Sequence, residues 1–121
     1  MTNPFDDQRR FMEACGQSTD RPNEAQHLMY YTLIKEEVAE LMAAERSMDR
    51  VEELDALIDI LVVTIGAIHS MGADGEGAWN EVMRTNFAKI DPVTGKVNKR
   101  PDGKVLKPEG WQPPDLARFL K

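Results

Sequence analysis

Five acidic side chains stand at helical spacing on two neighbouring stretches of the sequence. The first stretch, KEEVAE, carries Glu36, Glu37 and Glu40. The second, LDALIDILVV, carries Asp55 and Asp59 inside the most apolar run of the chain. Residues three or four apart project from one face of a helix, so each set shares a face. Ionised carboxylates in a partly buried space repel one another and lose hydration, so the pattern predicts a cation between them.

The expected cation is Mg²⁺, with Mn²⁺ able to take its place. Mg²⁺ prefers oxygen ligands and completes its coordination with water and substrate phosphates. The chain has two histidines and one cysteine, too few to favour a zinc site. Residues 51–71 contain no Lys or Arg that could pair with the aspartates instead. The competing interpretation is a solvated acidic helix face that binds nothing.

The surrounding sequence predicts an all-α fold with a four-helix bundle-type core. Apolar periodicity and capping residues predict helices over about 4–15, from residue 20 or 23 to about 47, 49–71 and 76–90. The core covers about 20–91 of a single domain, 1–121. The segment 92–121, rich in Gly, Pro and Lys, is expected to form an ordered loop or a small hairpin.

The short turn near residue 48 predicts that the second and third helices pack antiparallel. That packing would bring the glutamate face opposite the two aspartates. The third helix is apolar nearly all round, which is typical of a helix buried on most sides. A chain of this size needs a second subunit for such burial, so we expect a homodimer or homotetramer.

Charge is distributed unevenly along the chain. Residues 1–83 hold 17 acids and 6 bases, whereas residues 84–107 hold 7 bases and 2 acids. This acidic body argues against nucleic-acid binding, which needs a broad basic face. It suits a cation that carries phosphates. The apolar run 54–68 is too short and too charged to span a membrane. One cysteine and the absence of a signal-like N-terminal segment favour a cytoplasmic setting.

The ordered motifs resemble the all-α NTP pyrophosphohydrolase superfamily, in its MazG-like, phosphoribosyl-ATP pyrophosphohydrolase-like branch. KEEVAELMAAE, ELDALIDILVVTIGA, EVMRTNFAKID and DGKVLKPEGWQPPDL carry the resemblance over roughly residues 20–116. The family pattern is EExxE followed on the next helix by ExxD. Asp59 matches the final aspartate, but residue 56, where the preceding acid is expected, is Ala56. Either Asp55 or Glu52 could supply the missing carboxylate.

The resemblance implies roles for the acids and for the basic C-terminal half. Glu36 or Glu37 would act as the base, and the metal ligands would be drawn from Glu36, Glu37, Glu40, Asp55 and Asp59, with Glu52 in an outer position. Asn86 and Lys89 resemble the family's Asn-x-x-Lys and would contact phosphate or sugar, while Lys104 and Lys107 would close over phosphates. Trp79 and Trp111 could stack on a base, although large aromatics more often fill cores or interfaces.

The function implied is Mg²⁺-dependent hydrolysis of a nucleoside or deoxynucleoside triphosphate to the monophosphate and pyrophosphate, clearing the nucleotide pool. Two alternatives stay open. One is phosphoribosyl-ATP pyrophosphohydrolase activity on the same fold. The other is a non-catalytic helical interaction protein whose acids bind a structural cation.

Overall fold

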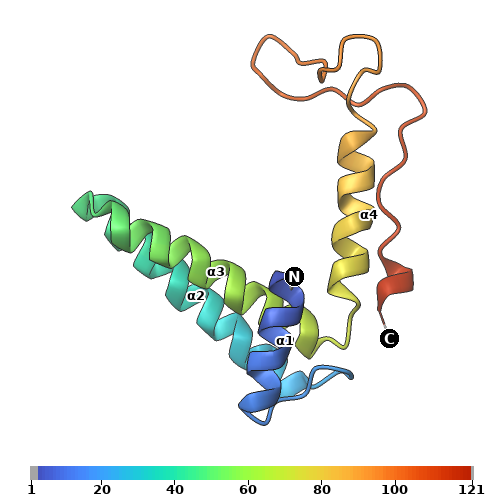
Figure 1. Ribbon diagram of the computed structural model, residues 1–121. Coiled ribbons are helices and arrows are strands. Elements are labelled where there is room, and N and C mark those ends of the chain that lie inside the picture. Colours follow the sequence, from blue (N-terminus) through green and yellow to red (C-terminus); the bar gives the residue numbers. More distant parts are fainter. Residues whose placement is uncertain (1–2, 121) are drawn as a thin grey trace. The chain divides into compact units, whose positions relative to one another are not determined.

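A computed structural model describes residues 3–120, and the chain divides into two compact units, one up to Gly75 and one over Glu76–Phe119. Four α-helices and a short 3₁₀ helix make up its regular structure (Figure 1): α1 Pro4–Ala14, α2 Glu24–Ser47, α3 Arg50–Ser70, α4 Gly75–Phe87 and η1 Ala117–Phe119. The all-α prediction is confirmed, and each helix ends within one turn of its expected limit. None of the described helices has the length and hydropathy needed to cross a membrane.

Side-chain caps begin the first three helices. Asn3 accepts a hydrogen bond from the Asp6 backbone N–H at 2.9 Å, and Pro4 occupies the first helical position of α1. Asn23 caps α2 and Asp49 caps α3 in the same manner, each at 3.1 Å. Such caps satisfy backbone N–H groups that have no partner within the helix. The alternative cap for α2, Asp20, is therefore not used.

Helices α2 and α3 lie side by side and antiparallel, as the short turn predicts (Figure 1). Met48 makes the turn in the left-handed conformation, with φ 59° and ψ 29°. This conformation is uncommon for a residue with a side chain and ends the helix abruptly. Ala44 on α2 and Ala56 on α3 are both buried. Their small side chains allow the two helices to approach closely near the turn.

The core of the first unit consists of Met12, Tyr30, Val63 and Ala67, with Leu33 and Ile34 packed against it. The Tyr30 ring lies directly against Gly66, where a Cβ atom would overlap the ring. The Tyr30 hydroxyl donates a hydrogen bond to Gln17 at 2.5 Å. Gly66 is therefore required for the fit of α2 against α3, and not for a special backbone angle.

His69 joins α1 to the end of α3. Its side chain is fully buried, and its Nε2–H donates to the Phe5 carbonyl at 2.9 Å. The other ring nitrogen, Nδ1, therefore accepts from the Arg9 guanidinium at 3.3 Å. Burial lowers the pKa of His69, which keeps the ring neutral at neutral pH. This histidine is a packing residue of the fold.

The two halves of α3 differ in burial within the single chain. Its second half is buried from Val63 onward, apart from two half-buried positions. In the first half, an apolar face stays exposed in the single chain and consists of Leu54, Leu57, Ile58 and Leu61, each 45–62% exposed. A run of large apolar residues with this exposure is typical of a surface that another protein covers.

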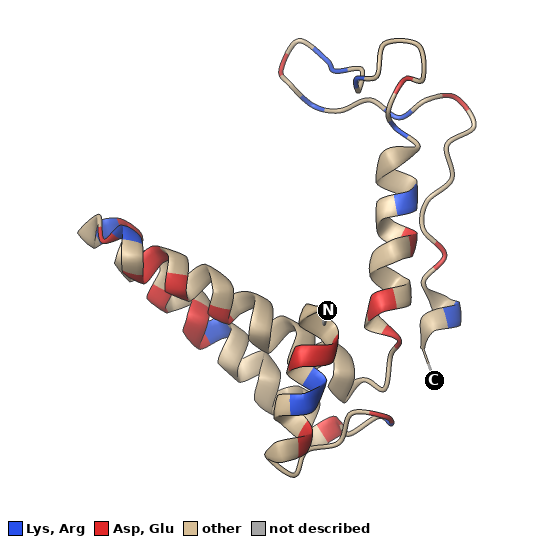
Figure 2. Cartoon of the chain, in the orientation of Figure 1, with Lys and Arg blue, Asp and Glu red and all other residues tan. Residues whose placement is uncertain are grey.

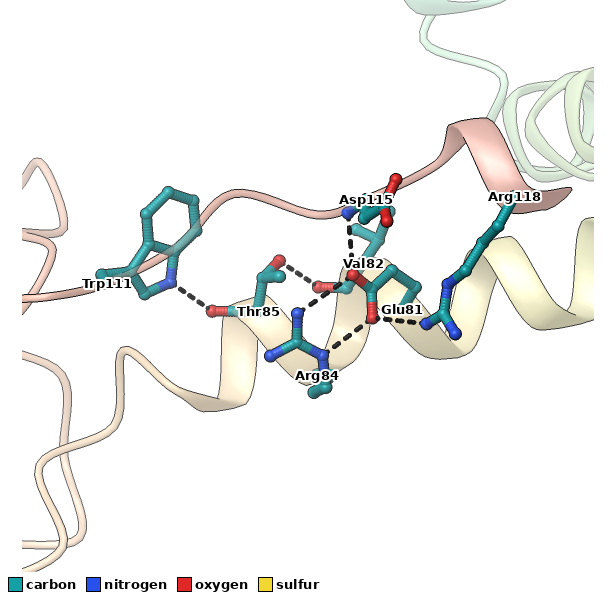
Figure 3. Close-up of polar contacts among 7 residues, drawn as sticks. All are labelled: Glu81, Val82, Arg84, Thr85, Trp111, Asp115 and Arg118. Atoms are coloured by element: carbon teal, nitrogen blue, oxygen red, sulfur yellow. Dashed lines mark hydrogen bonds and ion pairs between the residues drawn. The ribbon is translucent and has the colours of Figure 1, made fainter. Parts of the chain in front are cut away.

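In the second unit, the end of the chain is bound to α4 through Glu81, which is 4% exposed (Figure 3). Its carboxylate accepts from the Asp115 backbone N–H at 2.8 Å and from Arg118 at 3.3 Å. Arg84, one turn further along α4, donates to both of its oxygens, at 2.8 and 3.0 Å. Glu81 thus satisfies two guanidinium groups and one backbone amide.

The segment between α4 and this bound end is an ordered loop. Helix α4 stops at Phe87 rather than at the predicted residue 90, and residues 88–90 continue as a tight turn toward Asp91-Pro92. Two isolated antiparallel pairings follow, Ile90 with Val97 and Lys99 with Val105. No β-strand forms within residues 3–120. Of the two predicted forms, an ordered loop and a small hairpin, the segment therefore adopts the ordered loop.

The Glu81 contacts predict an acid-sensitive attachment of the chain end to α4. Hydrogen bonds from Arg84 and from the Asp115 amide, with the charges of Arg84 and Arg118, lower the pKa of Glu81 to about 2. A carboxyl group with a depressed pKa stabilises the fold above its unfolded value of 4.5. That contribution is lost as the pH falls from 4.5 toward 2. Trp111 reports on this attachment, because its indole N–H donates to the Thr85 carbonyl of α4 at 2.7 Å, so its fluorescence in a Trp79→Phe background should follow the loss. In Glu81→Gln the signal should change little over this range, and an unaltered pH profile would contradict the assignment.

Candidate functional site

Helices α2 and α3 form a helical hairpin, and its least satisfied polar atom belongs to Glu37 on α2. Its Oε2 atom is fully buried and has no hydrogen-bond partner within the described residues. Burial raises the pKa of Glu37, and a hydrogen bond between Glu37 and Glu40 and the negative charges of Glu40, Asp59 and Asp55 raise it further. Glu37 and Glu40 on α2 and Asp55 and Asp59 on α3 therefore lie near enough to interact through their charges, and we call these four side chains the acidic group.

The hairpin places these acids by simple geometry. Glu37 and Glu40 are one turn apart on α2, and Asp55 and Asp59 are one turn apart on α3. Because the helices run antiparallel from the turn at Met48, the two pairs come to the same level of the hairpin. Figure 2 shows acidic positions along adjoining lengths of α2 and α3. The glutamate pair and the aspartate pair, which the sequence predicts to face each other, thus lie near each other in space.

The two other predicted acids lie at the edge of this group. Glu36 and Glu52 are exposed, and neither contributes to the raised pKa of Glu37. Ala56, at the position where the resemblance expects an acid, is 3% exposed and faces the seam between the helices. A carboxylate there would be buried, whereas Asp55 is exposed and still acts on Glu37.

The acidic group concentrates negative charge but does not form a complete coordination shell for a metal ion. Within residues 3–120, no three Asp, Glu, His or Cys side chains are already close enough together to hold a metal ion. The all-carboxylate composition nevertheless suits a hard divalent cation. A buried carboxylate oxygen without a donor, beside three more carboxylates, is the arrangement that such a cation would relieve.

The predicted substrate-binding residues lie in the second unit, and three of them are close together. Asn86 accepts a hydrogen bond from the Lys89 ammonium at 3.2 Å. The Lys89 and Lys107 Nζ atoms lie 5.2 and 4.7 Å from the centre of the Trp111 ring. Lys104 lies apart in an exposed turn, and its side chain forms no hydrogen bond or ion pair within residues 3–120.

A cavity of about 360 Å³ opens beside these lysines. It is lined by residues 88–92 and by Asn98, Leu106, Lys107 and Pro108. No local pattern in the sequence marks Asp91 or Asn98 as functional, because their place at the cavity depends on how the loop folds back toward the end of α4. The acidic group and this cavity belong to different compact units.

The raised pKa of Glu37 predicts a stability gain from Glu37→Gln in metal-free buffer. Below pH 4.5, its ordinary value, the carboxyl group is protonated in both the folded and the unfolded chain. As the pH rises through the folded-state pKa, ionisation costs the folded state more than the unfolded state. The melting temperature of Glu37→Gln should therefore exceed that of the wild type at pH 7 with EDTA, and the gap should close near pH 4. Glu36→Gln, at the exposed neighbouring position, is the matched control. A lower melting temperature for Glu37→Gln at pH 7 would contradict the claim that burial and acidic neighbours make ionised Glu37 destabilising.

Comparison with known proteins adds one finding. The family model for phosphoribosyl-ATP pyrophosphohydrolase matches residues 9–86, more than half of the chain. A search of curated proteins found no similar sequence. The matched range contains the whole acidic group and Asn86, and it stops before the loop that carries Lys104 and Lys107. It supports pyrophosphohydrolase activity on a nucleotide and does not distinguish a nucleoside triphosphate from phosphoribosyl-ATP. The chain belongs to the phosphoribosyl-ATP pyrophosphohydrolase family, within the MazG-like all-α NTP pyrophosphohydrolase superfamily.

Proposed function

We propose that the protein hydrolyses a nucleoside or deoxynucleoside triphosphate to the monophosphate and pyrophosphate with the aid of Mg²⁺. The observation that carries this proposal is the partnerless buried oxygen of Glu37 among Glu40, Asp55 and Asp59. Such a group is costly to leave uncompensated in a folded protein. It lies inside the region that matches a family of pyrophosphohydrolases.

The acidic group would hold the cation, which is Mg²⁺ in our proposal, with Mn²⁺ able to replace it. When bound, the cation would supply positive charge toward phosphate oxygens and make a bound water more acidic. Asp55 is the better candidate than Glu52 for the acid missing at position 56, because only Asp55 acts on Glu37. Glu52 would hold an outer position.

The chain's own side chains would do the rest of the chemistry. Glu36 or Glu37 would accept a proton from the water that attacks the α–β phosphoanhydride linkage. Asn86 and Lys89 would hold phosphate or sugar oxygens, and Lys104 and Lys107 would add ammonium groups on the phosphates. Fixed groups that match the charge developing on the phosphates are a main source of rate enhancement in such reactions.

Phosphoribosyl-ATP is the second candidate substrate, and the family match itself favours it. Two features of the chain favour a nucleoside triphosphate instead. Position 56 carries Ala56 in place of the acid of the family pattern. The long ordered loop and chain end after residue 86 lie outside the matched range.

A substrate panel tests the proposal. Purified protein is incubated with Mg²⁺ and each of the common ribo- and deoxyribonucleoside triphosphates, with phosphoribosyl-ATP alongside, and pyrophosphate release is measured. We expect release from at least one triphosphate. Glu40→Gln and Asp59→Asn should each lower kcat by about 100-fold or more, the usual cost of removing a key electrostatic contact at the reacting phosphates.

Glu45→Gln is the matched control, because Glu45 is an exposed glutamate on α2 outside the acidic group. It should keep wild-type turnover. Release only from phosphoribosyl-ATP would select the second candidate. If folded protein turned over no nucleotide, or if both site variants kept full activity, the proposal would fail.

We also propose that a second copy of the chain covers the exposed apolar face of α3. Leu54, Leu57, Ile58 and Leu61 carry it, and burying each large aliphatic side chain is worth about 1.5–3 kcal/mol. Sedimentation velocity at micromolar concentration should show a dimer or tetramer. Leu57→Lys should shift the population toward monomer, whereas Val93→Lys, at a 91% exposed loop position, should not. A wild-type monomer at this concentration would contradict the proposal.

A further inference from the structure

Helix α1 and the middle of α3 lie on either side of a cavity of about 270 Å³ in the first unit, which we call the α1–α3 cavity. Helix α1 lies against α3 (Figure 1), and the hydrogen bond from His69 to the Phe5 carbonyl ties the two together. Two polar residues of α1, Asp7 and Gln8, line the cavity. The rest of its lining is apolar and consists of Pro4, Ile58, Leu61, Val62 and Ile65. An apolar hollow with a few polar groups is typical of a small-molecule site.

This cavity continues the face of α3 that carries the aspartates. Ile58 follows Asp55 by three residues, and Val62 follows Asp59 by three residues. Residues at this spacing are neighbours on one side of a helix, and one turn rises about 5.4 Å. The acidic group and the α1–α3 cavity also belong to the same compact unit. A ligand with phosphates at the acidic group can therefore reach the cavity with its other end.

Tyr30 fixes the orientation of the Gln8 amide. The Tyr30 hydroxyl donates its single proton to Gln17 at 2.5 Å, so its oxygen can only accept the hydrogen bond that joins it to Gln8. The nitrogen of the Gln8 amide is therefore the atom that faces Tyr30, and the amide oxygen is left as an acceptor. Gln8 is 7% exposed, so packing holds the amide in this orientation.

The polar side of the cavity consists of acceptors. Asp7 adds a carboxylate, which accepts hydrogen bonds, to the amide oxygen of Gln8. Within residues 3–120, Asp7 forms no ion pair, and no Lys, Arg or His lines the cavity. A ligand that fits must therefore bring an apolar ring and hydrogen-bond donors. Adenine, cytosine and guanine carry an exocyclic amino group, whereas uracil and thymine carry carbonyl oxygens in its place.

We propose that the α1–α3 cavity binds the base of the nucleotide substrate and favours adenine, cytosine and guanine over uracil and thymine. The inference rests on the proposed function and deepens it, since it names the class of base. The apolar lining covers the ring, and Asp7 and Gln8 accept from the amino group. A carbonyl oxygen of uracil or thymine in that place would leave both acceptors without a donor, which is costly in a desolvated site.

The cavity shares Ile58 and Leu61 with the apolar face of α3 that we propose a second copy covers. A copy on that face would lie over the outer side of the cavity and keep water from a bound base. It would leave Asp7 and Gln8 on α1 in place. A second copy that fills the cavity itself is the competing occupant, and the test below distinguishes the two.

The test is a titration of the full-length protein in EDTA with adenosine, cytidine or uridine, followed by nuclear magnetic resonance of labelled isoleucine methyl groups. Ile58 and Ile65 line the cavity. Ile34, on α2, and Ile90, in the second unit, do not line it and serve as internal references. We expect adenosine and cytidine to shift the Ile58 and Ile65 signals saturably. Uridine should bind about tenfold more weakly, because it leaves the acceptors unpaired.

Two variants with matched controls probe the polar and the apolar side of the cavity. Asp7→Asn should weaken cytidine binding by about tenfold and narrow its lead over uridine, because an Asn amide can donate to a carbonyl. Asp6→Asn, at the neighbouring exposed acid of α1, should bind as the wild type does. Val62→Phe should fill the cavity and abolish the shifts. Val51→Phe, at a 77% exposed position of the same helix, should not.

The proposal is overturned if no nucleoside shifts the Ile58 and Ile65 signals, if uridine binds as well as cytidine, or if Asp7→Asn binds cytidine unchanged. Signals that move on dilution of the protein and not with nucleoside would show that a second copy fills the cavity, which also overturns it. Nucleoside binding without turnover of any nucleotide would reject the proposed function alone. Turnover without shifts at these two methyl groups would reject this inference alone.

Discussion

The buried, partnerless oxygen of Glu37 beside the carboxylates of Glu40, Asp55 and Asp59 is the feature on which the proposed chemistry of the first unit depends. Burial and the negative charges of Glu40, Asp59 and Asp55 all raise the pKa of this one group. A protein gains no stability from such an arrangement. In our proposal a bound cation would offset this cost, and the packing of α2 against α3 holds the carboxylates in place without it.

The features that hold α2 against α3 are local contacts. Capped helix starts at Asn23 and Asp49 fix where α2 and α3 begin, and Met48 fixes the turn between them. Buried alanines near the turn draw the helices together, and the Tyr30 ring fits against Gly66 at the opposite end. Because contacts at both ends of this helical hairpin hold α2 against α3, the repulsion among the acids does not separate the two helices.

Much of this could be predicted from the sequence, because the relevant signals are local. Caps, apolar periodicity and Gly or Pro punctuation predict four helices and the ordered loop, and helical spacing predicts that the glutamates and aspartates share faces. The sequence leaves both Asp55 and Glu52 as candidates for the acid missing at position 56, since the burial of Ala56 depends on how the helices pack. The apolar pattern of α3 predicts that a second subunit covers part of the helix, but not that Leu54 and Leu57 are exposed in the single chain, because an apolar position looks the same whether its own chain or another covers it.

The arrangement of the second unit could not be predicted, because it rests on contacts between residues far apart in the chain. Glu81 binds Asp115 and Arg118, and Trp111 binds Thr85, across a loop with no regular period. A count of charges predicts a basic segment but not which lysines meet. Lys107 lies with Lys89 over one ring, whereas Lys104 lies apart, a difference that only the folded loop decides.

The most direct test of the central claim is a titration of Mn²⁺ into metal-free, full-length protein, followed by electron paramagnetic resonance of the free ion. We expect a saturable loss of the free Mn²⁺ signal that excess Mg²⁺ reverses. This loss should be retained in Glu45→Gln and absent in Asp59→Asn. A free-ion signal that is the same with and without protein, or equal binding by the wild type and Asp59→Asn, would contradict it.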